Sequence, residues 1–171
     1  GAGRDLISCC NDNDQLFGDA GFFKDEGDAG IDTIEGGAGA DVLSGGGDDG
    51  DTLSYLASSA GVVVDITHGV TTSVTGGDGQ GDSITGFTDV LGSAFGDVIT
   101  DTDSATLPSG QNDNMFRGGD GSDLLTLGGG ADTGFGDAGD DEIDGGEGDD
   151  LAEGGGGHDH LTLGGGADMG Y

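Results

Sequence analysis

From residue 109 onward, the apolar residues of the sequence recur with a period of nine. Seven consecutive nine-residue frames fit without an insertion, and all but the first begin with a glycine-rich stretch. The sixth positions of these frames are Asn114, Asp123, Asp132, Asp141, Asp150, Asp159 and Asp168. The eighth positions are Phe116, Leu125, Gly134, Ile143, Ala152, Leu161 and Gly170. Self-similarity at a short fixed period predicts a solenoid built from stacked repeats.

The last three residues of each frame are expected to form a very short strand with the eighth residue turned inward. Two frames then make one coil, and successive coils stack as parallel strands about 4.8 Å apart. The turns of every second frame therefore lie one above the other. We expect Asn114, Asp132, Asp150 and Asp168 to line one side of the coil, with Asp123, Asp141 and Asp159 on the other.

The N-terminal part follows the same period from residue 9 to residue 44, and a ten-residue frame, GGGDDGDTLS, comes next. Aspartates take the sixth position at Asp14, Asp32, Asp41 and Asp51. The frame at 18–26 departs from the pattern, with Phe23 in place of the aspartate and Asp25 in place of the apolar residue. Counting frames predicts one column of Asp14, Asp32 and Asp51, with Asp5 and Asp41 flanking the Phe23 turn.

The segment 55–76 breaks the period. Its β-branched runs VVVDI and VTTSVT, separated by THG, predict two strands and a tight connection. The nine-residue frames resume at 77–85 and 92–100, with Asp82 and Asp97 at the sixth position, and GFTDVL between them predicts another short strand. We expect this segment to continue the solenoid as wider coils with a larger apolar core.

The composition indicates that the solenoid needs counter-ions in order to fold. Among 171 residues there are 43 glycines, and 35 Asp plus Glu face 3 Lys plus Arg, for a formal net charge of −32. Such a chain cannot offset its conformational entropy unless cations neutralise the carboxylates.

The charge excludes nucleic acid and anionic membrane surfaces as partners. No apolar run is long enough to span a membrane, and the start lacks both an initiator Met and a signal peptide, as expected of a processed product or a piece of a longer protein.

The spacing of glycine and aspartate predicts a site for a hard cation. Glycines allow tight turns whose carbonyls point at one place, and the aspartate that follows supplies a carboxylate. Calcium takes six to eight such oxygen ligands in a flexible array, whereas magnesium demands a stricter octahedron and zinc prefers His and Cys. Acidic residues at positions three and five, such as Asp120, Asp140 and Asp149, are either outer ligands or solubilising charge.

These frames resemble the RTX nonapeptide GGxGxDxUx, in which U is a large apolar residue. GGAGADVLS at 36–44 and GGDGSDLLT at 118–126 match it at every defined position. The family comprises hemolysin-type calcium-binding repeats of secreted bacterial proteins. The resemblance implies an all-β fold: a parallel β-roll or β-helix solenoid of nonapeptide half-coils with calcium between stacked turns, interrupted by a wider β-helical insert. It divides this one solenoid into an N-terminal block (1–54), an insert (55–108) and a C-terminal block (109–171).

The resemblance also implies that several Ca2+ ions are bound by backbone carbonyls and by the residues at position six. These metal ligands are Asp5, Asp14, Asp32, Asp41, Asp51, Asp82, Asp97, Asn114, Asp123, Asp132, Asp141, Asp150, Asp159 and Asp168.

Nothing in the sequence predicts an enzyme. The zinc-protease motif HExxH and the nucleophile motif GxSxG are absent. His158 and His160 flank Asp159 at alternating positions, but no third ligand for a transition metal is evident, so exposed spacer residues are favoured. The adjacent Cys9 and Cys10 are poorly placed to bridge each other and favour apolar fillers or one interchain thiol.

Two functions remain open. In the first, the chain is an extracellular or cell-surface structural module that folds on calcium and stacks head to tail, with calcium bridging Asp159 to Asp5 and Asp168 to Asp14 of the next copy. The first and last residues, GAGRDLIS and LGGGADMGY, favour this reading because the nine-residue pattern nearly continues from one to the other. In the second, the chain is an accessory domain of a larger type I-secreted toxin, protease, lipase or adhesin. Binding of carbohydrate or cells is a weaker third reading, because aromatic residues are few.

Overall fold

The computed structural model describes residues 6–8, 15–17, 31–46, 50–67, 72–102 and 112–171. Within these ranges the chain forms short strands, one 3-10 turn at Gly77–Gly79 and no α-helix. The strands are β1 Leu6–Ser8, β2 Gln15–Phe17, β3 Thr33–Glu35, β4 Val42–Ser44, β5 Thr52–Ser54, β6 Val63–Ile66, β7 Thr72–Ser73, β8 Ser83–Thr85, β9 Asp89–Leu91, β10 Val98–Asp101, β11 Met115–Asp120, β12 Leu124–Thr126, β13 Thr133–Ala138, β14 Glu142–Asp144, β15 Leu151–Glu153, β16 His160–Thr162 and β17 Met169–Gly170.

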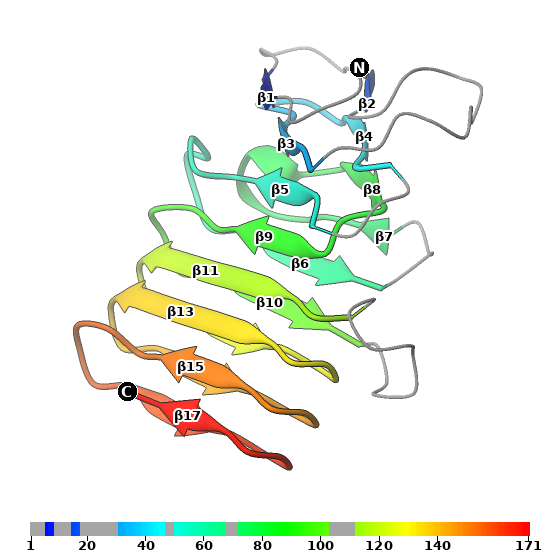
Figure 1. Cartoon of the computed structure of the whole chain (residues 1–171). Coiled ribbons are helices and arrows are strands. Elements are labelled where there is room, and N and C mark those ends of the chain that lie inside the picture. The colour runs from blue at the N-terminus through cyan, green and yellow to red at the C-terminus, as the bar shows by residue number, and fades with distance from the viewer. Residues whose placement is uncertain (1–5, 9–14, 18–30, 47–49, 68–71, 103–111) are drawn as a thin grey trace.

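The strands form the two walls of a flattened solenoid, as Figure 1 shows. One wall is an eight-stranded sheet in the order β1-β3-β5-β9-β11-β13-β15-β17. The opposite wall consists of a four-stranded sheet, β2-β4-β8-β7, and a five-stranded sheet, β16-β14-β12-β10-β6. All pairings are parallel except that of β7 with β8. The expected all-β parallel solenoid is therefore confirmed.

The register of the first coils differs from the frame count. Strand β1 pairs with β3, Leu6 opposite Thr33, and β2 pairs with β4, Gln15 opposite Val42. The strand after Asp14 is thus on the opposite wall from the strand after Asp32, so the expected column of Asp14, Asp32 and Asp51 is wrong. Each of these two pairings joins residues 27 apart, which is three frames, instead of the two frames that the count predicts.

Several predictions for the N-terminal part lie on residues outside the described ranges. Asp5 and Asp14 are among them, as are Phe23, Cys9 and Cys10. Their roles therefore stay predictions.

The core is a thin layer of side chains between the two walls. Most regular frames contribute their eighth-position residue, and Leu125, Phe116 and Ile143 are completely buried. The segment 52–101 contributes more, because Tyr55, Val62, Val74 and Phe87 add to the core residues of its strands. The wider apolar core expected of this segment is present.

Gly134 stands where the nine-residue pattern calls for a core residue because Leu127 fills that space. Leu127, at the first position of the same frame, is completely buried. A Cβ on Gly134 would lie 3.2 Å from Cδ1 of Leu127 and 3.1 Å from Cγ2 of Ile143, closer than ordinary contact. Gly170 has the same relation to Leu163, at 3.2 Å. In the two frames that begin LGGGAD, the large side chain is therefore at position one and the glycine at position eight, and the leucine fills the core space.

The segment between β5 and β8 joins the two sheets of the second wall. Both β-branched runs form strands, β6 and β7, as predicted, and the run GFTDVL contains β9. An antiparallel bridge links Val63 to Thr75, so β7 lies between β6 and β8. The connection through THG falls within 68–71, which the structure does not describe.

Candidate metal centre

The carboxylates at position six tie each coil to its neighbour. The backbone N–H of Asn114 donates to Oδ1 of Asp132 at 2.7 Å, and Asp132 donates in the same way to Asp150, and Asp150 to Asp168, both at 3.0 Å. Each donor and acceptor are 18 residues apart, which is one coil. The predicted stacking of these four residues in one column is confirmed.

The second column has the same construction. Asp123 donates its N–H to Oδ1 of Asp141 at 2.9 Å, and Asp141 donates to Asp159 at 3.1 Å. Asp97 extends the column, because its N–H donates to Oδ1 of Asp123 at 2.7 Å. The predicted stacking of Asp123, Asp141 and Asp159 is confirmed, and the sequence had not placed Asp97 with them.

Two shorter columns of the same kind of hydrogen bond join the N-terminal coils. The N–H of Asp32 donates to Oδ1 of Asp51 at 2.8 Å, which confirms that these two residues share a column. The N–H of Asp41 donates to Oδ1 of Asp82 at 2.8 Å. The column of Asp41 therefore continues into the insert.

The second oxygen of several of these carboxylates is buried without a donor. The Oδ2 atoms of Asp123, Asp132, Asp141 and Asp150 are inaccessible to solvent and accept no hydrogen bond. An ionised oxygen in such a place is costly unless a positive charge compensates it. Regularly spaced carboxylate oxygens that lack any protein donor are what a bound cation requires, so the residues fit a metal ion.

Backbone carbonyls converge on the same places. A Cβ on Gly145 would lie 2.8 Å from Oδ2 of Asp150 and 2.8 Å from the carbonyl oxygen of Leu163 in the next coil. Glycine at the first position of the frame therefore leaves open a space that both oxygens face. Within the described ranges no three His, Cys, Asp or Glu side chains cluster as a metal site. The ligands would thus combine one carboxylate with backbone carbonyls, a set of hard oxygens suited to calcium.

The acidic residues at position five have a role that the sequence did not reveal. The N–H of Ala131 donates to Oδ1 of Asp113 at 2.9 Å, and that of His158 to Asp140 at 2.9 Å. The N–H of Ala167 donates to Asp149 at 2.8 Å. Asp140 and Asp149 therefore bind backbone of the next coil, which neither expected role includes.

Three of the predicted ligands already hydrogen-bond to other protein groups through their side chains. Oδ2 of Asp82 accepts a hydrogen bond from the Tyr55 hydroxyl at 2.8 Å, and Oδ2 of Asp97 accepts one from the N–H of Ser93 at 2.6 Å. The side-chain amide of Asn114 donates to Oδ2 of Asp101 at 2.7 Å. The repeat pattern does not predict Tyr55 or Asp101 as partners, because both lie outside the glycine-rich frames. The assignment of Asp82, Asp97 and Asn114 as calcium ligands remains a prediction.

Burial raises the pKa of the column carboxyls. The pKa of Asp123 and that of Asp132 each rise to about 7, chiefly because burial disfavours the charged form. The N–H donated to each one acts in the opposite direction, and neighbouring carboxylates raise the pKa further. The pKa values of Asp141 and Asp150 are raised from the same main cause.

Calcium affinity is expected to rise with pH between about pH 5 and about pH 8. Because the folded pKa values lie above the ordinary 3.8, protonation stabilises the metal-free fold, fully below about 3.8 and no longer above about 7. Protons and calcium thus compete for the same oxygens. Isothermal titration calorimetry at a series of pH values measures the effect. An affinity independent of pH across this interval would show that these carboxyls do not titrate with raised pKa values in the calcium-free chain.

The fold and its columns define a metal-binding parallel β-solenoid. The family model of the RTX calcium-binding nonapeptide repeat matches residues 26–51, 109–143 and 135–169, with four copies. Since these residues make up half of the sequence, the chain belongs to this family. RTX repeats bind calcium ions at multiple sites and are typical of secreted bacterial proteins. A comparison with curated proteins found no match.

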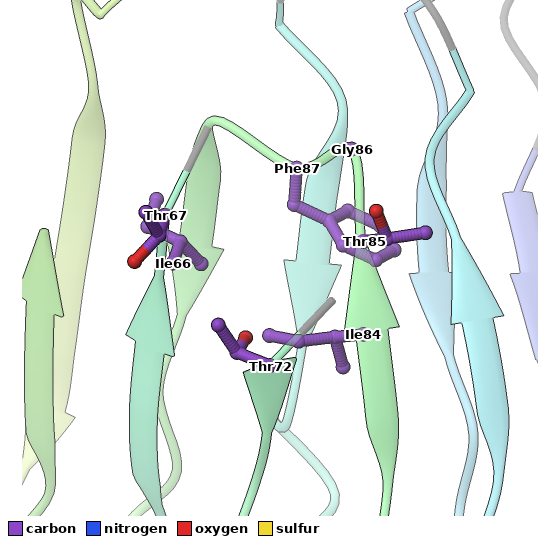
Figure 2. A pocket seen from close by; sticks show the side chains of 7 residues that line it. All are labelled: Ile66, Thr67, Thr72, Ile84, Thr85, Gly86 and Phe87. Atoms are coloured by element: carbon purple, nitrogen blue, oxygen red, sulfur yellow. The ribbon is translucent and has the colours of Figure 1, made fainter. Parts of the chain in front are cut away.

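The surface of the insert holds a small pocket without ionisable groups. It is lined by Ile66, Thr67, Thr72, Ile84, Thr85, Gly86 and Phe87, from β6, β7, β8 and the turn after β8 (Figure 2). These side chains offer hydroxyls and apolar surface but no general acid or base. The repeat family itself is a structural calcium-binding module rather than a catalytic one. In the part of the chain that the structure describes, no helix is long and apolar enough to cross a membrane.

Proposed function

We propose that the chain is an extracellular structural module that folds when calcium binds and then stacks with further copies of itself. The observation that supports calcium-coupled folding is the set of buried Oδ2 atoms without donors at Asp123, Asp132, Asp141 and Asp150. In a chain of net charge −32, these oxygens oppose folding until a cation neutralises them.

The residues that hold the ions follow from the columns. Asp132 and Asp150 in one column, and Asp123 and Asp141 in the other, offer Oδ2 to the ion while Oδ1 keeps the N–H of the preceding coil. The bound ion supplies positive charge between stacked turns. Carbonyl oxygens of the adjoining turn, such as that of Leu163 beside Asp150, complete the oxygen set. Asp159 and Asp168 continue the columns.

The thin core makes this dependence on calcium useful for export. Each C-terminal frame buries at most one large apolar side chain, so hydrophobic burial alone contributes little to the stability of these coils. Where calcium is scarce, as in the cytosol, the chain remains unfolded and can pass through a secretion channel. Folding then occurs outside the cell, where calcium is abundant.

Far-ultraviolet circular dichroism during calcium titration tests the coupling. We expect the β-structure of the C-terminal coils to be lost in chelator and recovered with calcium, because the metal contributes folding free energy directly. Magnesium at the same concentration serves as the control and is not expected to substitute. Identical spectra in chelator and in calcium would refute calcium-coupled folding.

Further coils, from another copy or from the same protein, can be added at β16 and β17. β16 and β17 are the last strands of their sheets, and Met169 on β17 is 55% exposed. The backbone groups of an edge strand are available for pairing with another chain. Asp159 and Asp168 directly precede β16 and β17, where a further coil could share their ions.

The alternative is an accessory domain in a larger secreted toxin, protease, lipase or adhesin, in which further residues of the same protein supply the next coil. Electron microscopy and analytical ultracentrifugation in calcium separate the two readings. Filaments that dissolve in chelator support stacking of copies. A folded monomer at all concentrations would exclude stacking and favour the accessory domain.

A further inference from the structure

The turn before β8 satisfies its aspartate in a different way from the regular repeats. Asp82 is completely buried, and its Oδ1 accepts the N–H of Asp41 at 2.8 Å, as position-six carboxylates do elsewhere. Its Oδ2 accepts the Tyr55 hydroxyl, also at 2.8 Å. The corresponding Oδ2 atoms of Asp123 and Asp141 have no donor. A phenol thus donates to Asp82 at the oxygen that has no donor in these repeats.

Tyr55 is fixed so that its hydroxyl reaches this place. The side chain is 1% exposed, and its backbone N–H donates to the carbonyl of Leu91 at 2.8 Å, which anchors it to the end of β9. The ring packs against Gly79, where a Cβ would lie 3.0 Å from Cε1 of the tyrosine. A residue larger than glycine would displace the ring, so the turn and the tyrosine fit each other.

Serine side chains hold the rest of the same turn. The Ser58 hydroxyl accepts the N–H of Asp78 at 3.0 Å and donates to the carbonyl of Ala60 at 2.7 Å. The Ser59 hydroxyl donates to Oδ1 of Asp78 at 3.0 Å. The glycine-rich turn at 76–81 is therefore stabilised by the preceding loop through neutral donors and acceptors.

The other position-six aspartate of the insert is satisfied by protein as well. Oδ1 of Asp97 accepts the N–H of Val62 at 2.7 Å and the hydroxyl of Ser93 at 2.9 Å. Its Oδ2 accepts the N–H of Ser93 at 2.6 Å. Both position-six aspartates of the insert thus have a donor at Oδ2, whereas Asp123, Asp132, Asp141 and Asp150 of the C-terminal repeats have none.

The apolar core is also concentrated here. Of the 17 hydrophobic residues that form the described core, 10 lie between residues 52 and 101. Those core residues are Leu53, Tyr55, Val62, Val64, Ile66, Val74, Ile84, Phe87, Val90 and Ile99. Hydrophobic burial, which scales with the apolar area removed from water, is therefore greatest where the carboxylates need no cation.

We propose that protein donors, with the Tyr55 hydroxyl foremost, replace calcium in the insert, so that residues 52–101 fold without metal and provide the surface on which the calcium-dependent coils assemble. The proposal rests on calcium binding by the flanking RTX repeats. It assigns Asp82 and Asp97 to structural rather than metal-binding roles. Assembly begins at β9 and β10, because β11 and β12 of the first C-terminal coil pair directly with them.

Hydrogen–deuterium exchange of the full chain, in calcium and in chelator, tests the proposal. In chelator we expect the amides of β5, β6, β8, β9 and β10 to stay protected while those of β13 to β17 exchange freely. Calcium should protect the latter group strongly and change the former little. If the insert exchanges as freely as the repeats in chelator, the proposal is wrong. If neither group responds to calcium, calcium-coupled folding itself has failed.

Tyr55→Phe isolates the hydroxyl, because the ring and its packing remain. In chelator, protection of β5 and β8 is expected to fall roughly 10- to 100-fold, the range for a lost hydrogen bond to a charged group. Calcium should restore part of it, because a cation can then neutralise the freed oxygen of Asp82. Tyr171→Phe is the matched control: this hydroxyl is exposed and contacts only Sδ of Met169 at 3.7 Å, so no change is expected.

The response of the variant to calcium distinguishes a replaced ion from an ordinary structural hydrogen bond. A gain of calcium dependence at β5 and β8, absent from the unmodified chain, supports replacement. An equal loss of protection in calcium and in chelator would contradict it. Unchanged protection of Tyr55→Phe in chelator would also overturn the proposal, since the hydroxyl would then contribute nothing.

Discussion

Leu127→Ala is expected to lower the free energy of unfolding of the calcium-bound chain by about 2–5 kcal/mol. Leu127 is completely buried and fills the space beside Gly134, which itself contributes no side chain to the core. No neighbouring residue of that frame can take its place, so the substitution leaves a cavity. Chemical denaturation in saturating calcium measures the loss.

A pair of substitutions shows whether the two positions share one space. Gly134→Leu alone is expected to lower the free energy of unfolding by about 1–3 kcal/mol, because the new side chain would overlap with atoms of Leu127 and Ile143. Leu127→Gly combined with Gly134→Leu restores the repeat pattern of the neighbouring frames and should be more stable than either Leu127→Ala or Gly134→Leu. If the effects at the two positions simply added, the exchange of volumes would be disproved.

Asp132→Asn is expected to remove about 2–4 kcal/mol of the stabilisation that calcium gives, since one site at a hundredfold excess over its Kd contributes about 2.7 kcal/mol. The amide oxygen can still accept the N–H of Asn114, as Oδ1 of Asp132 does. The other oxygen, which is buried without a donor, becomes an NH2 group that cannot bind a cation. Thermal denaturation in calcium and in chelator, with calorimetric counting of bound ions, measures the change.

Asp140→Asn is the matched control for that substitution. It removes the same charge from an exposed carboxylate that also accepts a backbone N–H from the next coil, that of His158. The asparagine keeps an oxygen that can accept this hydrogen bond, and the substitution alters no buried oxygen that lacks a donor. The stabilisation by calcium should therefore be nearly that of the unmodified chain. Equal losses from Asp132→Asn and Asp140→Asn would show that net charge, not a specific site, determines the response.

The period of nine predicted the C-terminal coils because every frame there repeats a turn and an Asp or Asn at position six. The hydrogen bonds that run from Asn114 to Asp168 follow from that regularity alone. The same counting failed before Thr33, where the paired strands are three frames apart instead of two. The number of frames can be read from the sequence, but strand pairing depends on contacts between coils that the period does not contain.

Two features could not be predicted because they depend on contacts between different parts of a coil. Leu127 and Gly134 are separate departures from the repeat in the sequence, and only the folded coil brings them into one space. Tyr55 lies outside every frame and is 27 residues from Asp82, so nothing in the period connects the two. In both cases the repeat shows that a position is unusual, and the three-dimensional arrangement supplies the reason.

The hydrogen bonds along the columns also determine how the solenoid responds to a stretching force. At position six each coil donates its N–H to a carboxylate of the following coil, whereas at position five the following coil donates to a carboxylate of the preceding one. Neighbouring coils are therefore joined by side chains from both partners, in addition to their strands. Tension applied at the C-terminus would load these joints in series, and each release would free 18 residues, about 60 Å of extended chain. A solenoid stretched in this way would yield in equal steps and absorb energy at each one.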